Sequence, residues 1–218
     1  MPRLVDIACI VLAAGRSTRM GEANKLLAEL GGKPMVRRVV EAALASGARP
    51  VLVVTGHQAA SVQAALGGLD VTFVGNPDFA SGLSSSLKAG IRAVPASADG
   101  VLVLLGDMPQ ITGAHLDRLI AAFSAEQGAA IVVSTHEGRR GNPVLWPRTR
   151  FAEMLQLEGD AGARRLMAAH ADEVREVDLG ADAIFADVDT PEALAQLRED
   201  CHPGRSAKHG EPGPRAKD

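Results

Sequence analysis

The densest group of potential anion ligands in the sequence is LAAGRSTRMGEANK, residues 12–25. Arg16, Arg19 and Lys25 give this segment three cations against a single acid. Backbone N–H groups in such a loop can surround a phosphate, and Gly15 lets the backbone approach it closely. A triphosphate carries about as much negative charge as these cations balance. Because the P-loop and dinucleotide-binding patterns are absent, the spacing alone predicts either another kind of phosphate loop or an ordinary turn with solvated arginines.

Aspartates that follow apolar runs form a second group of candidates. Asp107 ends the run in LLGDMP, where packing explains it poorly because an unpaired buried charge is costly. It would suit Mg²⁺, which prefers one or two carboxylates together with phosphate oxygens and water. Asp189 in DVDTPE would supply the second carboxylate, with Asp187 a weaker candidate. A helix cap explains Asp189 equally well, whereas Thr112 already offers a cap to the helix after Asp107.

Two further segments place polar side chains at expected helix starts. Ser84–Ser86, within NPDFASGLSSSLKAG, have hydroxyls that suit a nucleobase or a phosphate, although a single serine would suffice as a cap. GDAGARRL adds Asp160 and Arg164, for which a cap and a surface arginine are the simpler explanation. The six histidines form no zinc-binding pattern.

Short β-branched runs that alternate with alanine-rich amphipathic stretches must position these segments. This order predicts βαβ units and a largely parallel sheet, whose ligands bind beyond the carboxyl ends of the strands. Strands are expected at Ile7–Leu12, Val51–Thr55, Val71–Gly75, Val101–Leu105 and Ala130–Ser134. Helices are expected at Pro34–Ser46, His57–Leu66, Leu83–Ala93 and, capped by Thr112, up to Ala125.

The alternation changes after Thr135. We expect a turn at Gly138–Gly141, strands at Pro143–Trp146 and Val174–Leu179, and helices at Arg148–Leu157, Ala161–Ala169 and Pro191–Glu199. No linker interrupts residues 1–200, so one domain is predicted there. Residues 201–218 lack apolar periodicity and are predicted to be a disordered tail.

Composition narrows the classes of function. Hydrophobic residues make up 46% of the 218 residues, but only 3% are aromatic and none is tyrosine, so a stacking platform for nucleic acid is not expected. The net charge of −3 does not indicate a polyanion-binding body. Cys9 and Cys201 have neither disulfide-like context nor metal-ligand spacing. Since no apolar run reaches about 20 residues and no signal peptide is evident, we expect a cytoplasmic protein without a membrane partner.

The motifs LAAGRSTRMG–NKLL, GLSSSL–AG, LGDMP, RRGNP, GDAGAR and D-TPE, in this order, resemble the MobA-like nucleotidyltransferases. The resemblance covers about Ile7 to Leu197. LAAG rather than LAGG, Asn24-Lys25 rather than Asp-Lys, and GDAGAR make the chain more similar to the molybdenum cofactor cytidylyltransferase branch than to the guanylyl branch.

The resemblance implies a Rossmann-like three-layer α/β sandwich with a mostly parallel sheet that carries at least one antiparallel strand. It also implies CTP as nucleotide and Mg²⁺, or Mn²⁺, as cofactor, with Arg16, Lys25 and Asp107 as catalytic residues. Asp107 and Asp189 would hold the metal. The residues implied in nucleotide binding are Leu12, Ala13, Ala14, Gly15, Arg16, Arg19, Lys25, Gly82, Ser84, Ser86 and Asp107.

The implied reaction is transfer of CMP from CTP to the phosphate of molybdopterin, with release of pyrophosphate. Arg140–Pro143 would face the pterin, but Asn142 stands where relatives usually have His, which leaves any acid–base or stacking role at this position open. A molybdoenzyme or its maturation chaperone is a further implied partner. Transfer of GMP, transfer to another phosphate acceptor, and a non-catalytic molybdopterin-binding chaperone are the alternatives.

Overall fold

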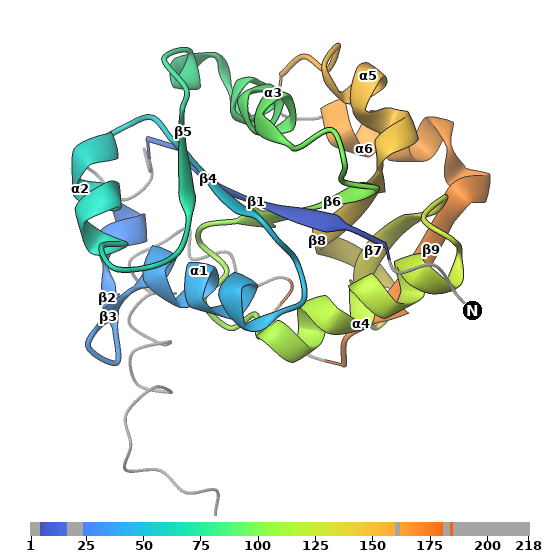
Figure 1. The fold of residues 1–218 in the computed structure, drawn as a ribbon, viewed down its shortest axis with the longest axis horizontal. Helices are drawn as coiled ribbons and strands as arrows, with labels where there is room; N and C mark the ends of the chain where they lie inside the picture. The colour runs from blue at the N-terminus through green and yellow to red at the C-terminus, as the bar shows by residue number, and fades with distance from the viewer. Residues whose placement is uncertain (1–4, 17–23, 160–161, 181–183, 185–218) are drawn as a thin grey trace, which may run out of the picture.

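The computed structural model describes residues 5–16, 24–159, 162–180 and 184, to which the structural statements below refer. Its centre is a seven-stranded sheet of order β5-β4-β1-β6-β8-β7-β9 (Figure 1). The strands are β1 (Ile7–Ala13), β4 (Val51–Thr55), β5 (Thr72–Gly75), β6 (Gly100–Leu105), β7 (Ile131–His136), β8 (Arg139–Pro147) and β9 (Val174–Asp178). β8 pairs antiparallel with both β6 and β7, whereas the other pairs in this sheet are parallel.

Helices cover both faces of the sheet. α1 (Met35–Ala45), α2 (Ala59–Ala65) and α4 (Gly113–Ala125) lie on one face, and α3 (Leu83–Ala93), α5 (Phe151–Met154) and α6 (Gly162–Ala169) on the other (Figure 1). Short 3₁₀ turns are η2 (Lys25–Leu27), η3 (Phe79–Ser81), η4 (Arg148–Arg150) and η5 (Ala171–Glu173). A small antiparallel pair, β2 (Glu29–Leu30) and β3 (Lys33–Pro34), precedes α1.

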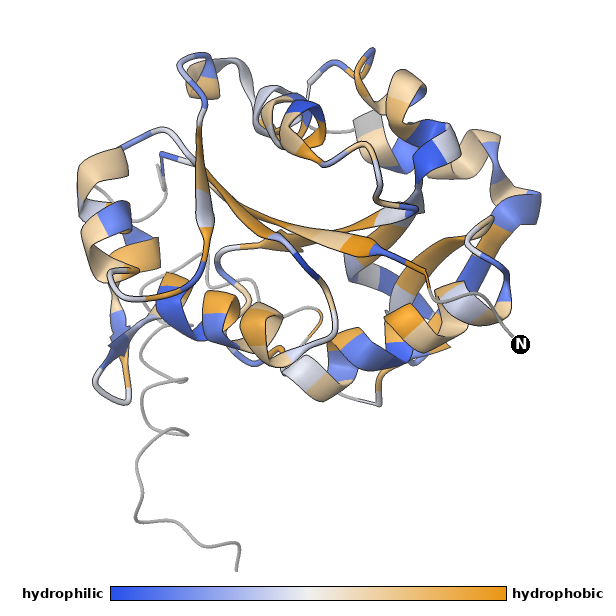
Figure 2. Cartoon of the chain, viewed as in Figure 1, coloured by the Kyte–Doolittle hydropathy of each residue, from blue (hydrophilic) through white to orange (hydrophobic). Residues whose placement is uncertain are grey.

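The alternation of side chains along β1 creates two cores. Cys9 and Val11 pack into the core with α1, α2 and α4, whereas Ile10 and Leu12 pack into the core with α3, α5 and α6. All seven residues of β1 are buried, as a strand covered on both faces requires. Figure 2 shows the same arrangement as mainly hydrophobic strands between helices that carry both hydrophobic and hydrophilic residues. The chain is therefore a three-layer α/β sandwich, and the predicted fold class is confirmed.

The predicted strands and helices up to residue 134 are confirmed to within about two residues at each end, with Leu83–Ala93 reproduced without change. Thr112 is the N-cap of α4, where its hydroxyl accepts a hydrogen bond from the backbone N–H of His115. The predicted turn at Gly138–Gly141 is wrong in extent. Glu137 and Gly138, both with positive φ, form a two-residue hairpin turn, and β8 begins immediately afterwards at Arg139.

The region after β8 also differs from the prediction. The expected helix Arg148–Leu157 is divided into η4 and the four-residue α5. The expected helix Pro191–Glu199 lies outside the described residues, and one domain over 1–200 with a disordered tail stays a prediction. Among the described residues, no helix is both long and apolar enough to cross a bilayer. Cys9 is fully buried, which raises the pKa of its thiol to about 12.

Candidate active site

Four loops converge at the carboxyl edge of the parallel strands, the left-hand side of Figure 1. Three backbone hydrogen bonds join neighbouring loops, each from the N–H of a residue after one strand to the carbonyl of a residue in or after the adjacent strand. They run from Gly106 to Leu12 (3.0 Å), from His57 to Ala14 (3.2 Å) and from Asn76 to Thr55 (2.8 Å). The loops after β1, β4, β5 and β6 are therefore held as one surface, where an open α/β sheet binds its ligands.

Lys25 and Asp107 meet on this surface although they lie far apart in the sequence. Lys25 begins η2, which is capped by Asn24 through a hydrogen bond from the Leu26 N–H to Asn24 Oδ1. Asp107 follows β6, and Lys25 Nζ lies 2.6 Å from its Oδ2, with 14% of each side chain exposed. Gly106 permits the close approach of the two loops, since a Cβ there would lie 3.0 Å from the Leu12 carbonyl oxygen. The pair is a charge-assisted contact in a largely water-excluded position.

The other carboxylate oxygen of Asp107, Oδ1, lacks among the described residues the kind of partner that Lys25 provides to Oδ2. Oδ1 is buried and has no hydrogen-bond partner within the described part of the chain. A buried carboxylate oxygen without a donor is costly unless a ligand supplies positive charge or a proton. One carboxylate beside the loop predicted to bind phosphate is a donor set that fits Mg²⁺ or Mn²⁺, with phosphate and water as the remaining ligands. No cluster of three or more His, Cys, Asp or Glu that could hold a metal occurs among the described residues.

The start of the first loop combines small residues with a cation. Ala13 and Ala14 are buried, whereas Gly15 is exposed and a Cβ there would meet nothing within 4 Å. The exposed guanidinium of Arg16 lies over the ring of Phe79, with its Cζ 5.4 Å from the ring centroid. Open space above Gly15 beside an arginine is the arrangement that an incoming phosphate needs.

The loop after β5 leads into α3 and carries the predicted serines. Gly82 is the N-cap residue of α3 at φ 108°, a conformation that only glycine adopts readily. Asn76 Nδ2 donates to the hydroxyls of Ser85 (2.9 Å) and Ser86 (3.0 Å), so Ser86 is already engaged inside the fold. Ser84 is 9% exposed, has no hydrogen-bond partner for its hydroxyl among the described residues, and lines a cavity of about 820 Å³. Ser84 is therefore better placed than Ser86 to bind a ligand.

Comparison with known proteins identifies the family to which this fold and site belong. The sequence matches the MobA-like NTP transferase domain over residues 9–174. The chain belongs to this family. It is 31% identical over 214 residues to the purine catabolism protein PucB of Bacillus subtilis, covering 87% of this chain and 94% of PucB. It is 38% identical over 146 residues, or 63% of this chain, to the bifunctional protein GlmU of Pelobacter propionicus, and spans only 30% of that protein.

The solved structures agree with the family. Rv0371c from Mycobacterium tuberculosis is 31% identical, with a TM-score of 0.77 over 90% of this chain and 99% of that one. The same protein has also been crystallised in complex with manganese, a structure to which this chain is 30% identical with a TM-score of 0.74, over 90% and 100% of the two chains. The family and its nucleotidyltransferase relatives make this MobA-like domain a transferase of nucleotidyl groups.

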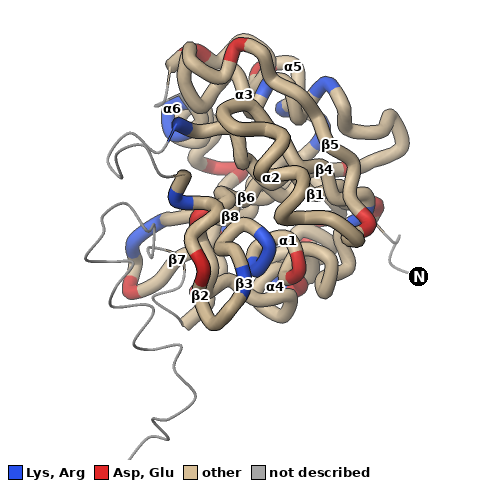
Figure 3. Tube along the Cα trace, turned by 90° about the vertical axis from the view of Figure 1, so that its left-hand side faces the viewer, with Lys and Arg blue, Asp and Glu red and all other residues tan. Residues whose placement is uncertain are grey.

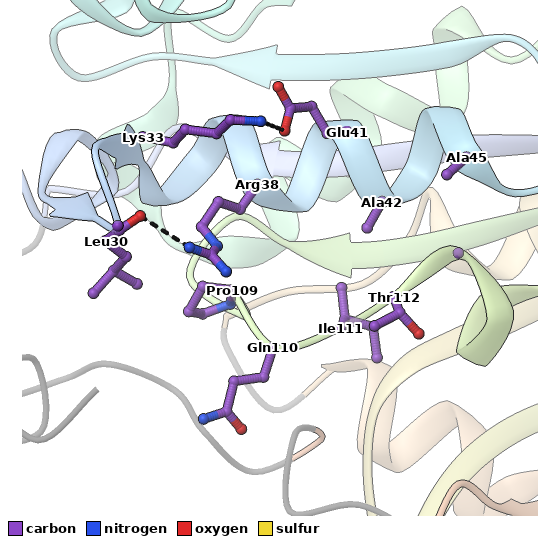
Figure 4. Close-up of a pocket in the computed structure, with 12 residues that line it drawn as sticks. Leu30, Lys33, Arg38, Glu41, Ala42, Ala45, Pro109, Gln110, Ile111 and Thr112 are labelled. Atoms are coloured by element: carbon purple, nitrogen blue, oxygen red, sulfur yellow. Dashed lines mark hydrogen bonds and ion pairs between the residues drawn. The ribbon is translucent and has the colours of Figure 1, made fainter. Parts of the chain in front are cut away.

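A second cavity, of about 660 Å³, lies where α1 and the β2–β3 pair face the loop that follows Asp107 in the MobA-like domain (Figure 4). Arg38 lines it and donates from Nη1 to the Leu30 carbonyl (2.9 Å). Lys33 Nζ donates to Glu41 Oε2 (2.8 Å), and this hydrogen bond is the main reason that the pKa of Glu41 is lowered. These contacts fix the hairpin to α1, and residues 109–113 line the same cavity.

Several predicted site residues of the MobA-like domain are placed elsewhere or lie outside the description. Arg19, Asp160, Asp187 and Asp189 lie outside the described residues. Arg140 Nε donates to Glu176 Oε1 at 2.7 Å across the sheet surface. Figure 3 views the left-hand side of Figure 1 and shows Lys and Arg interspersed with Asp and Glu along the chain.

The sequence did not indicate two residues that organise this edge. Asn76 joins the loop after β5 to the start of α3, and Phe79 supports Arg16. A signal existed for Phe79, since it is an aromatic residue in a glycine- and serine-rich loop of a chain with only 3% aromatic residues. No comparable signal distinguishes Asn76 from an ordinary turn residue.

Proposed function

We propose that this chain transfers CMP from CTP to the terminal phosphate of a molybdopterin-type acceptor and releases pyrophosphate. The observation that carries nucleotidyl transfer is the Lys25–Asp107 pair beside the loop of Ala13 to Arg16, with Asp107 Oδ1 left without a donor among the described residues. The choice of CTP and of a pterin acceptor rests on the sequence, through LAAG, Asn24-Lys25 and GDAGAR.

Asp107 would hold the divalent cation through its buried carboxylate, and Asp189 is proposed as the second ligand. Manganese in the crystal structure of Rv0371c supports a divalent metal in this family. When bound, Mg²⁺ supplies positive charge that neutralises the phosphate oxygens during transfer. Lys25 Nζ lies 2.6 Å from Asp107 Oδ2 and orients the carboxylate, so the aspartate is positioned for a cation.

The reaction is an in-line displacement at the α-phosphorus. A terminal phosphate oxygen of the acceptor forms the new bond, the bond from the α-phosphorus to the oxygen that bridges it to the β-phosphorus breaks, and pyrophosphate leaves. Phosphate oxygens are already ionised near neutral pH, so the step requires no general base. The protein contributes positioning and charge neutralisation, for which Arg16 and Lys25 are the described cations at the loop. The absence of histidine at Asn142 is compatible with this scheme.

Small residues and one hydroxyl are proposed to hold the base. Ala13 and Ala14 are buried at the end of β1, and Ser84 offers a hydroxyl without a partner among the described residues. Backbone groups and a single hydroxyl can distinguish the hydrogen-bonding edge of cytosine from that of guanine, because an unmatched buried polar group costs free energy. Base choice therefore does not require an aromatic platform here.

Pyrophosphate release tests the proposal. The protein is incubated with Mo-molybdopterin, Mg²⁺ and one of CTP, GTP, ATP or UTP, and pyrophosphate is measured over time. We expect release with CTP that depends on both Mg²⁺ and the pterin, and that Asp107→Asn abolishes. Release with GTP alone would overturn the cytidylyl assignment, and release without the pterin would overturn the acceptor. Binding of the pterin without pyrophosphate release from any nucleotide would favour a non-catalytic molybdopterin-binding chaperone.

A further inference from the structure

Phe79 crosses from the loop after β5 to the loop after β1. It begins η3, and its ring lies beneath the guanidinium of Arg16, with Arg16 Cζ 5.4 Å from the ring centroid. The imidazole of His57, from the loop after β4, contacts the same ring at a centroid distance of 6.1 Å and an interplanar angle of 47°. One aromatic ring thus touches residues from both neighbouring loops of the site.

Close packing fixes the position of this ring. Gly56 leaves the space that Phe79 fills, since a Cβ at Gly56 would lie 2.6 Å from Phe79 Cβ and 2.9 Å from Ala14 Cβ. Phe79 is half-buried and packs against the core that includes Ala14 and Val54. The hydrogen bond from the His57 N–H to the Ala14 carbonyl holds the two loops on either side of the ring. The ring is therefore a fixed support for a side chain placed over it.

A neutral ring holds a cation without neutralising it. Arg16 has no carboxylate partner within the described part of the chain, so no described anion competes for its five N–H donors. A cation over an aromatic face is attracted by the ring quadrupole, and the contact also restricts the rotamers of a long side chain. A carboxylate in the same place would orient Arg16 equally well but would compete with phosphate for it.

We propose that Phe79 is a positioning residue that presents the Arg16 guanidinium to the triphosphate of the nucleotide. This inference rests on the proposed function, because it assumes that the loop after β1 binds the phosphates of an NTP. It differs from stacking of the base on Phe79, which would strengthen binding with or without Arg16. Phe79 acts through Arg16 and touches no reacting atom.

A double-mutant cycle separates these roles. The dissociation constants of the full chain and of Phe79→Leu, Arg16→Met and the double variant are measured with Mg²⁺ and whichever of CTP, GTP, ATP and UTP raises the thermal stability of the wild type most. We expect Phe79→Leu to weaken binding about two- to fivefold in the wild type and not measurably in the Arg16→Met background. A merely structural role would lower affinity equally in both backgrounds.

A conservative variant guards against a general loss of folding. Phe79→Tyr keeps an aromatic face and should restore wild-type affinity, whereas Phe79→Leu should not, at equal thermal stability. An equal loss in both Arg16 backgrounds, or full affinity in Phe79→Leu, overturns the inference and leaves the proposed function standing. If the wild type binds none of the four nucleotides, the proposed function falls together with it.

Discussion

The two described cations of the first loop, Arg16 and Lys25, are held in opposite ways. Lys25 lies 2.6 Å from a carboxylate oxygen of Asp107, and 14% of each side chain is exposed. Arg16 is exposed and lies over the neutral ring of Phe79 at 5.4 Å. Both have the same charge and both are proposed to face a triphosphate, yet Lys25 is paired with an anion, whereas Arg16 has no anionic partner among the described residues.

This difference determines how strongly each cation is coupled to the fold. Removing one partner of a buried ion pair lowers the stability of the protein by about 3–5 kcal/mol, because the other charge is left buried without compensation. An exposed cation–π contact is worth about 0.5–1 kcal/mol. Lys25 and Asp107 therefore behave as a single unit of structure and chemistry, whereas Arg16 is a surface group whose contribution can be adjusted.

The largest effect is expected from Asp107→Asn. This change keeps the shape of the side chain but removes the charge that Lys25 contacts and that a divalent cation requires. We expect kcat/KM for nucleotidyl transfer to fall by at least about 100-fold, the size of effect seen when a preorganised electrostatic group is removed from an active site. Steady-state pyrophosphate release measures it, with Mg²⁺ varied to detect weaker metal dependence.

Asp70→Asn is the matched control for this change. Asp70 is exposed and precedes β5, at the opposite edge of the sheet from the loops that surround Asp107. It should keep wild-type turnover and wild-type metal dependence. Normal turnover in Asp107→Asn would contradict the assignment of Asp107 as a metal ligand. It would also show that the Lys25–Asp107 pair is not part of the chemistry.

Lys25→Met should have the second-largest effect. The loss is expected to be at least about tenfold in kcat/KM, or roughly 1.4 kcal/mol of transition-state stabilisation. Because Asp107 then lacks its partner, thermal stability should also fall, unlike in a variant that only weakens substrate binding. Lys33→Met is the control, since Lys33 is 54% exposed and pairs with Glu41 on a different surface. Equal effects of the two lysine changes would show that Lys25 has no particular role in nucleotidyl transfer.

The sequence predicts the strands of this fold well because burial on both faces leaves short, continuous apolar runs rich in β-branched residues. Val101–Leu105 is a run of apolar residues, and the structure buries Val101, Leu102 and Leu104 completely. The polar start of β8 has no such signal. Residues 139–141 pair with β7 across a two-residue turn, and that pairing depends on a partner strand rather than on the local residues.

In the site, too, the sequence indicates some residues, but their contacts are visible only in the structure. Asp107 is conspicuous because a carboxylate after a buried strand is poorly explained by packing, and Lys25 because it lies in a segment rich in cations. Their mutual contact, however, spans 82 positions and depends on the order of the strands. Phe79 is noticeable in the sequence as a rare aromatic residue among small ones, but that signal does not indicate which side chain it contacts. Its role is visible only when Gly56 and Ala14 are seen to leave room for its ring.

Arg16→Ala tests the exposed half of the comparison. We expect a smaller loss than for Lys25→Met, of about three- to tenfold in kcat/KM, without loss of thermal stability. The effect should also depend on salt, because the Debye length falls from about 10 Å at 0.1 M to about 3 Å at 1 M ionic strength and an exposed charge is screened more than a buried pair. Kinetics of both variants at the two salt concentrations measure this. A salt-independent Arg16 effect would contradict the exposed, adjustable role.

Gly56→Ala should give the smallest loss of activity, because it disturbs the Phe79 ring beneath Arg16 rather than Arg16 itself. Its Cβ would lie 2.6 Å from Phe79 Cβ, so the ring must move away from Ala14 and from beneath Arg16. We expect a loss of about 1–3 kcal/mol of stability from overpacking and a fall of about two- to fivefold in kcat/KM, similar to the loss of the cation–π contact. Gly47→Ala is the control. Gly47 follows the C-cap of α1, and a Cβ there would lie 3.7 Å from Asp117 Oδ1, which is an ordinary contact. Gly56→Ala could lower stability and yet leave the loss of kcat/KM caused by Arg16→Ala, and its salt dependence, unchanged. Phe79 would then support only the fold, and Arg16 and Lys25 would differ in exposure but not in how they are positioned.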